Sequence, residues 1–138
     1  MLSVWITGAS SGIGEACAYR YAEEGARLVL TSSSVNRLEP VAARCRELGA
    51  TEVNILPYDL TCLDGIDTLT DKAWDAMKGI DIVMLNAGIS QRTNVEDTSM
   101  EMVRKIMEIN YFAPVAIAKR LLPKMVGRGY GKIAVTTS

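Results

Sequence analysis

The sequence contains no histidine and only three cysteines, Cys17, Cys45 and Cys62, and no two of them form a CxxC pair. A Ser-His-Asp hydrolase needs an imidazole base, and zinc sites are built mainly from clustered cysteine and histidine. Both classes are therefore excluded, and we expect no metal site. Because Cys17 and Cys45 fall on the apolar stripes of predicted helices, buried and reduced thiols are expected.

The chain has neither an excess of charge of one sign nor a long apolar run. Its 15 basic and 16 acidic residues leave a net charge of -1, and no segment gathers Lys and Arg, so nucleic acid is not expected as a partner. No apolar run reaches the roughly 18 residues that cross a membrane. Residues 1–6 lead directly into a glycine-rich segment, which leaves no room for a signal peptide. These absences predict a soluble, cytoplasmic protein without a membrane partner.

What the sequence does contain is a regular alternation of short apolar runs with amphipathic stretches. With 138 residues and 49% apolar composition, the chain can form one globular domain with a core of useful size. The alternation predicts an α/β fold, in which a doubly wound parallel sheet lies between two layers of helices. The predicted strands are 3–6, 27–31, 53–58, 81–85 and 132–135.

Three helices are predicted between the first four strands. The first covers 13–24 and ends at Gly25, and the second covers about 35–48 and ends at Gly49, because glycine favours helix ends. The third carries apolar residues at helical spacing at Ile66, Leu69, Ala73 and Met77.

A fourth and longer helical segment opens at Thr98, with Glu101 at the spacing of a capping box, and runs to about Gly127. Pro114 lacks the N–H that would bond to the carbonyl of Asn110 in a continuous helix. We therefore expect the helix to break there, leaving that carbonyl free to hold a water. The alternative is a simple kink at Pro114 with Asn110 as a local cap.

The run TGASSGIG over residues 7–14 follows the first strand and opens directly into a helix. A glycine turn lets the backbone approach a pyrophosphate, and the N–H groups at the helix N-terminus hold the phosphates. Glu15 stands where a P-loop needs lysine, which disfavours a nucleoside triphosphate. The alternative is a tight turn without a ligand. The predicted cofactor contacts here are Gly8, Ser10, Ser11, Gly12, Ile13 and Gly14.

Two further motifs follow later strands in order. Asp59 and Leu60 come after the third strand, and Asn86, Ala87 and Gly88 come after the fourth. Together with the TGxxxGxG spacing, they resemble the short-chain dehydrogenase/reductase family over the whole chain. The resemblance implies an NAD(P)-binding Rossmann-type fold, with the Asp contacting adenine. Leu85 departs from the first Asn of the family's NNAG run, and taken alone residues 86–88 could be an ordinary turn.

The resemblance also assigns two catalytic positions. Asn110, within IMEINYF, falls on the family's catalytic Asn, and Ser138, which closes GKIAVTTS, falls on its catalytic Ser. In the family, Ser polarises the carbonyl, Asn holds a water, Tyr exchanges the proton and Lys lowers the pKa of that Tyr. The family's Tyr-x-x-x-Lys run would come about a dozen residues beyond Ser138. The chain thus holds about five of the usual seven strands, without the C-terminal part.

The end of the second strand bears on the choice of cofactor. Ser32 stands where NAD enzymes carry an acidic residue, while Ser33 and Ser11 stand where NADP enzymes often carry cations. A missing carboxylate removes repulsion against a 2′-phosphate, and serine hydroxyls can donate to it. The sequence therefore favours NADP and leaves NAD open.

The resemblance implies an oxidoreductase that interconverts a small-molecule carbonyl and an alcohol, complete only with the C-terminal part. NAGISQR, DTS and INY are similar to the branch that reduces lipophilic carbonyls such as steroids and retinoids. Family members pair through the helix that corresponds to residues 111–125, so a homo-oligomer is expected. A non-catalytic dinucleotide-binding module and a dimerising fragment remain as alternatives.

Overall fold

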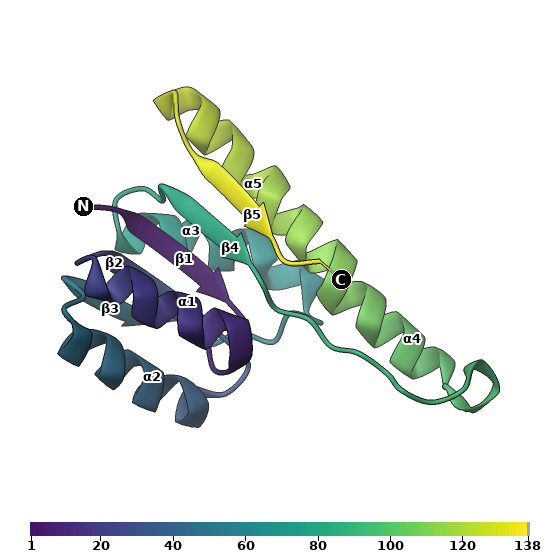
Figure 1. The fold of residues 1–138 in the computed structure, drawn as a ribbon. Coiled ribbons are helices and arrows are strands. Elements are labelled where there is room, and N and C mark those ends of the chain that lie inside the picture. Colours follow the sequence, from purple (N-terminus) through teal and green to yellow (C-terminus); the bar gives the residue numbers. More distant parts are fainter. Residues whose placement is uncertain (138) are drawn as a thin grey trace.

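The computed structural model describes residues 1–137, which form one parallel sheet between helices (Figure 1). The five strands run in the order β3-β2-β1-β4-β5, and every neighbouring pair is parallel. Their bounds are β1 Ser3–Thr7, β2 Arg27–Thr31, β3 Glu52–Ile55, β4 Ile82–Leu85 and β5 Lys132–Val135. The predicted doubly wound α/β fold is therefore confirmed.

Helices cover both faces of this sheet. Their bounds are α1 Gly12–Glu23, α2 Val35–Leu48, α3 Ile66–Ala76, α4 Met100–Met107 and α5 Ala113–Arg128. Short 3-10 turns, η1 Leu63–Gly65 and η2 Val95–Asp97, precede α3 and α4. None of the helices in the described part of the chain combines the length and the apolar character needed to cross a membrane.

The core is divided into two layers by the alternation of side chains along β1. Val4 and Ile6 point to the face covered by α1 and α2, where they pack with residues such as Leu38. Trp5 points to the opposite face, which α3 and α5 cover, and packs with residues such as Leu121. All five of these side chains are fully buried, so β1 is the centre of the fold.

The strand β3 is shorter than predicted, ending at Ile55 rather than at Tyr58. Leu56 and Tyr58 still donate backbone hydrogen bonds to Leu30 and Ser32 of the neighbouring chain segment, both at 2.9 Å. Pro57 lies between them, and its ring holds φ at about −65°, away from the value of a parallel strand, so the regular strand ends before it although hydrogen bonds to the β2 segment continue.

The fourth helical segment differs from the prediction in two ways. The N-cap of α4 is Ser99, whose hydroxyl accepts a hydrogen bond from the Met102 amide at 3.1 Å. Thr98 instead donates its hydroxyl hydrogen bond to the Asn94 carbonyl at 2.9 Å, so the predicted capping box of Thr98 with Glu101 was wrong. Ser and Thr are both good caps, and the sequence offers them side by side.

The predicted break at Asn110 is a π-helical turn, η3, over Glu108–Phe112. The chain remains helical from α4 through η3 to α5, and Pro114 lies in the first turn of α5, where a missing N–H is tolerated. A π-helical turn holds one residue more than an α-helical turn. The α-helical pattern is thus interrupted at Asn110 without the helix ending there, and a free Asn110 carbonyl stays a prediction.

The three cysteines are free thiols in different surroundings. Cys45 is buried, and this burial raises the pKa of its thiol to about 11. Cys17 is half-buried, whereas Cys62 is exposed, so the expectation of buried thiols was wrong for Cys62. It lies in the loop after β3, outside the helix stripes on which the expectation was based.

Candidate cofactor site

The glycine-rich turn joins β1 to α1 with two glycines in the left-handed region, Gly8 at φ +65° and Gly12 at φ +56°. Gly14 is required for a different reason. A Cβ at Gly14 would lie 2.7 Å from the Asn86 side-chain nitrogen and would also collide with the Gly8 carbonyl group. Gly14 therefore lets the first turn of α1 pack against its own loop and against the loop after β4.

A hydrogen-bond network ties this turn to the end of β4. The Thr7 hydroxyl accepts hydrogen bonds from the backbone amides of Asn86 and Ala87, both at 3.1 Å. The Asn86 side-chain amide donates to the Gly8 carbonyl at 3.3 Å, and its oxygen accepts from the Thr136 hydroxyl at 2.9 Å. Asn86 therefore links the loops that follow β1, β4 and β5. Sequence reasoning missed Thr7 and Thr136.

The side chain of Leu85, which replaces the first Asn of the family's run, points into the core. It is 4% exposed and packs in the cluster under α3 and α5. The polar links between the loops are made by its neighbours Thr7 and Asn86 instead.

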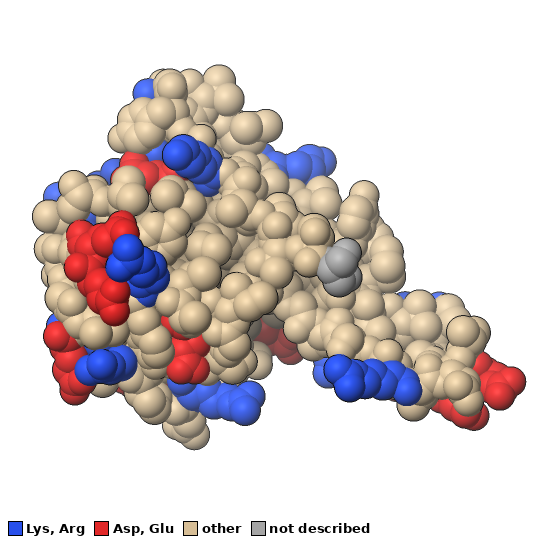
Figure 2. Space-filling model, in the orientation of Figure 1, with Lys and Arg blue, Asp and Glu red and all other residues tan. Residues whose placement is uncertain are grey.

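A cavity of about 670 Å³ opens at the carboxyl ends of β1, β2, β3 and β4. It lies where α4 projects away from the sheet, and Figure 2 shows the surface hollowed beside this projection. The lining residues are Gly8, Ser10, Ser11, Ser32, Ser33, Tyr58, Asp59, Leu60, Thr61, Asn86, Ala87, Gly88, Ile89, Glu101, Lys105 and Ile109. Ten of these residues were predicted as cofactor contacts.

Three other predicted contacts, Gly12, Ile13 and Gly14, do not line the cavity. They lie in the first turn of α1 behind its wall. The α4 side of the cavity is formed by Glu101 and Lys105 of α4 and by Ile109 of η3, at a spacing of four residues, and it was not predicted at all.

Asp59 and Lys105 lie at the β3 end of the cavity. One carboxylate oxygen of Asp59 accepts hydrogen bonds from the Thr61 hydroxyl at 2.7 Å and from the Thr61 amide at 3.0 Å. These two bonds hold the pKa of the Asp59 carboxyl below its usual value, and the nearby Lys105 ammonium lowers it further. Asp59 is therefore an anion and a hydrogen-bond acceptor at neutral pH.

The serines after β2 line the cavity next to this end, since β2 is the neighbour of β3 in the sheet. The Ser32 hydroxyl accepts a hydrogen bond from the Ser34 amide at 3.2 Å. Ser34 caps α2 by accepting from the Arg37 amide at 3.3 Å. Ser33 is exposed, and no hydrogen bond from residues 1–137 engages its hydroxyl. Its hydroxyl is thus available to a ligand.

Asn110 does not line the cavity but positions a residue that does. Its side-chain oxygen accepts from the Ile89 amide at 2.9 Å, and its side-chain nitrogen donates to the Ile89 carbonyl at 2.7 Å. A Cβ at Gly88 would lie 3.3 Å from the same oxygen. Asn110 thus fixes the loop after β4 against the π-helical turn. Ser138 lies outside the described residues.

This geometry fits a dinucleotide. At Gly8 and Gly14 the turn carries no side chain where it packs against the loop after β4. Because α1 begins directly after the turn, the free N–H groups at the N-terminus of α1 are available to phosphates. The cavity extends to both sides of this turn, as a bound molecule with two nucleotide halves requires. Within residues 1–137, no group of three or more His, Cys, Asp or Glu side chains could hold a metal ion.

Comparison with known proteins points to one family. Human dehydrogenase/reductase SDR family member 7 is 41% identical over 138 residues, which is 98% of this chain and 41% of that protein. An Arabidopsis thaliana 11-beta-hydroxysteroid dehydrogenase-like protein 2 is 38% identical and is covered over 44% of its length. The chain therefore spans about two fifths of the length of these curated relatives.

Solved structures agree in fold. An alcohol dehydrogenase from the archaeon Thermococcus sibiricus, complexed with 5-hydroxy-NADP, matches the whole chain with a TM-score of 0.91 and 33% identity, over 58% of its own length. A metagenomic short-chain oxidoreductase in complex with NADP matches 99% of the chain with a TM-score of 0.93 and 27% identity, over 62% of its own length. The model of the short chain dehydrogenase family matches residues 3–138, and the chain belongs to that family.

Proposed function

We propose that this chain is the cofactor-binding part of an NAD(P)-dependent oxidoreductase that interconverts a carbonyl and an alcohol. The observation that carries the proposal is the cavity at the carboxyl ends of four parallel strands, between the glycine turn and the Asn86 to Gly88 loop. The nicotinamide of the bound cofactor supplies or takes the hydride. The chain's own residues hold the phosphates at the turn and position the loop at Ile89 through Asn110.

The family position of Ser138 supports a role in polarising the substrate carbonyl, and that of Asn110 supports a role in holding a water. The family's Tyr and Lys have no counterpart in this chain. A lipophilic carbonyl compound is the substrate class that we propose, because a relative is named for hydroxysteroids and because NAGISQR resembles that branch. A cytoplasmic location remains a prediction.

The cofactor that we propose is NADP, with NAD as the alternative. Two solved neighbours hold NADP or a derivative of it. At the end of β2, no carboxylate would repel a 2′-phosphate, and the Ser33 hydroxyl is available.

Substituting the two serines tests the proposal. Ser33→Arg should tighten NADPH binding about tenfold, because a guanidinium binds phosphate in a bidentate manner. Ser32→Asp should shift the preference toward NADH by about tenfold or more, because the carboxylate repels the 2′-phosphate and accepts from the ribose hydroxyls. Dissociation constants for both reduced cofactors are measured by fluorescence titration.

Arg37→Lys serves as a control, because it keeps the charge on an exposed residue beside the cap of α2. It should leave both dissociation constants within about twofold of the parent values. If the parent chain bound neither dinucleotide, the proposed function would be wrong. If Ser32→Asp left NADPH binding unchanged, the placement of the ribose at the end of β2 would be wrong.

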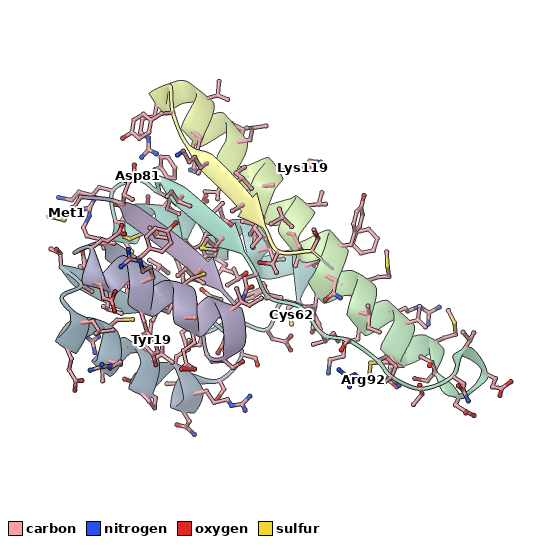
Figure 3. All side chains as sticks on the ribbon, in the orientation of Figure 1. Met1, Tyr19, Cys62, Asp81, Arg92 and Lys119 are labelled. Carbon is pink, nitrogen blue, oxygen red and sulfur yellow. The ribbon has the colours of Figure 1, made fainter. Side chains whose placement is uncertain are left out.

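A further part of the proposal is self-association through α5. Three apolar side chains of this helix, Val115, Leu122 and Val126, are exposed at helical spacing, and Tyr111 of the preceding turn η3 continues the same spacing. Figure 3 shows Lys119, in the same helix, pointing away from the sheet. Contiguous exposed apolar surface of this kind marks an interface between proteins.

Leu122→Glu combined with Val126→Glu should therefore convert an associated species to monomer, with the dissociation constant raised at least 100-fold. Sedimentation velocity measures the change. Val35→Glu is the matched control, since this exposed valine begins α2, on the other face of the sheet (Figure 1). Unchanged association of the double variant would locate the contact elsewhere.

A further inference from the structure

We propose that Arg128 is a positioning residue that acts through α5 to hold the cavity loop at Ile89 in place. Arg128 is the last residue of α5, and its contacts lie before β4, whereas the cavity opens after β4. In Figure 3, Asp81 marks this end of the sheet, away from the projecting α4. The inference rests on the proposed function only for its effect on cofactor binding.

The Arg128 guanidinium is held on several sides. Its central carbon lies 4.9 Å from the centre of the Trp74 ring and 4.0 Å from the centre of the Tyr130 ring. One terminal nitrogen donates to the Ile80 carbonyl and lies 3.5 Å from a carboxylate oxygen of Asp81. Rings that face a planar cation and acceptors at its edge leave it little freedom to move.

The backbone between α3 and β4 is shaped around this guanidinium. Lys78 and Gly79 both lie in the left-handed region, at φ +53° and +116°. A lysine adopts this conformation rarely, and a Cβ at Gly79 would collide with a terminal nitrogen of Arg128. The loop thus leaves room for the guanidinium in the position that it occupies.

Asp81 carries this contact into the sheet. Its amide donates to the Ser3 carbonyl at 2.9 Å, and its carboxylate accepts from the Ser3 amide at 2.8 Å. Its carbonyl accepts from the Lys132 amide at 2.9 Å. Asp81 is thereby fixed to β1 and to β5, the strands on both sides of β4. Arg128 consequently fixes the end of α5 to the amino end of β4.

The other end of the same helix holds the cavity loop. The turn η3 continues into α5, and Asn110 of η3 bonds to both backbone groups of Ile89. The helix from Asn110 to Arg128 rises about 27 Å at about 1.5 Å per residue. The segment from Ile80 to Ile89 spans at most about 30 Å at about 3.3 Å per residue. The helix and β4 are therefore joined by two polar contacts of matching spacing.

Between the two contacts, α5 packs against the core cluster of β4 through four buried side chains, Ala113, Ile117, Leu121 and Met125. Apolar contacts are not directional, so by themselves they do not fix the position of the helix along its axis. The ion pairs of Arg120 and Lys124 with Asp71 tie α5 to α3, and not to β4. Without the guanidinium contact, we expect the helix to shift along β4 and to loosen the contact at Ile89.

Hydrogen exchange at the Ile89 amide measures this loosening directly, because that amide donates to Asn110. NMR of the ligand-free chain compares Arg128→Met, which removes the guanidinium but keeps an aliphatic stem, with Arg128→Lys, which keeps the charge. Val41→Ala is the matched control, since Val41 is buried in α2 on the other face of the sheet. Its truncation lowers the stability of the chain without changing a contact of α5.

Arg128→Met should speed exchange at Ile89 about tenfold, as expected for the loss of a hydrogen bond from a charged group. Arg128→Lys should speed it about threefold, because an ammonium keeps the charge but cannot stack as a planar cation. Val41→Ala should leave it within about twofold of the parent, because a loop amide exchanges through local opening rather than through global unfolding.

Cofactor binding provides a second measurement. In the proposed function, the nicotinamide half of NADPH lies across the glycine turn from the adenosine half, on the β4 side, where Ile89 lines the cavity. Arg128→Met should therefore weaken NADPH binding about fivefold. Adenosine 2′,5′-bisphosphate, which lacks the nicotinamide half, should bind within about twofold of the parent. Calorimetric titration measures both ligands.

Unchanged exchange at Ile89 in both Arg128 variants would overturn the inference, and Arg128→Lys keeps this test open if Arg128→Met does not fold. An equal increase in Val41→Ala would also overturn it, because it would indicate a general loosening. So would an equal loss of NADPH and adenosine bisphosphate binding, since the whole site would then be affected. If the parent chain bound neither ligand, the proposed function would be wrong, and the exchange rates would still decide the role of Arg128.

Discussion

The 138-residue chain, assayed with NADPH and a carbonyl substrate, is expected to show no turnover above the uncatalysed rate. In the proposed function Asn110 and Ser138 position a water and a carbonyl, but neither an amide nor an alcohol side chain is an effective proton donor at neutral pH. Tyr58 is the one tyrosine that lines the cavity within residues 1–137. Its hydroxyl donates to the Cys62 carbonyl, and burial raises the pKa of its phenol, so it is a poor substitute acid.

The comparison is a chimera in which the part of the human relative that follows the matched region is joined after Ser138. It should regain turnover by at least about 100-fold over the chain alone, because a positioned general acid contributes roughly 10² to 10⁴ in rate. Circular dichroism of both proteins checks that each is folded. Robust turnover by the short chain would show that Tyr111, Tyr130 or another residue supplies the proton.

Gly14→Ala is expected to have the largest effect of any single methyl group added to the chain. The new Cβ would collide with the Gly8 carbonyl group and the Asn86 side-chain nitrogen. These two groups are hydrogen-bonded to each other and link the loops that follow β1 and β4. Relieving the clash would separate these loops, at a cost of about 3 kcal/mol or more in the free energy of unfolding. NADPH binding should weaken by more than about 100-fold, since the same loops form the cavity.

Gly127→Ala provides a matched control, because Gly127 lies within α5 and a Cβ there would meet nothing within 4 Å. It should stabilise the chain by about 0.5–1 kcal/mol through helix propensity. Urea unfolding measures both variants. A Gly14→Ala chain that unfolded and bound NADPH like the parent would contradict the close packing of the turn.

Much of the site could be predicted because parallel strands bring their carboxyl ends to one edge of the sheet. Once each strand was placed, Gly8, Asp59 and Asn86 had to lie near one another, whatever the helices did. The cavity bears this out, since all three line it. The roles of these residues in binding and of Asn110 and Ser138 in catalysis remain predictions.

The α4 side of the cavity could not be predicted from the same pattern. Glu101, Lys105 and Ile109 reach the cavity only because α4 projects along it (Figure 1), and the direction of a helix depends on packing beyond its own sequence. The early end of β3 could have been predicted from Pro57, but the strand was extended to Tyr58 because the residues around the proline are mostly apolar.

The π-helical turn at Glu108–Phe112 constrains how the length of this protein can change in evolution or by design. Deleting one residue there would restore regular α-helical spacing, but it would rotate α4 by about 100° relative to α5. Lys105 would then leave the cavity, and Asn110 would lose its register with Ile89. Insertions should be tolerated in the exposed loop at residues 90–94, whereas the residue count between Lys105 and Ala113 should be invariant among functional variants.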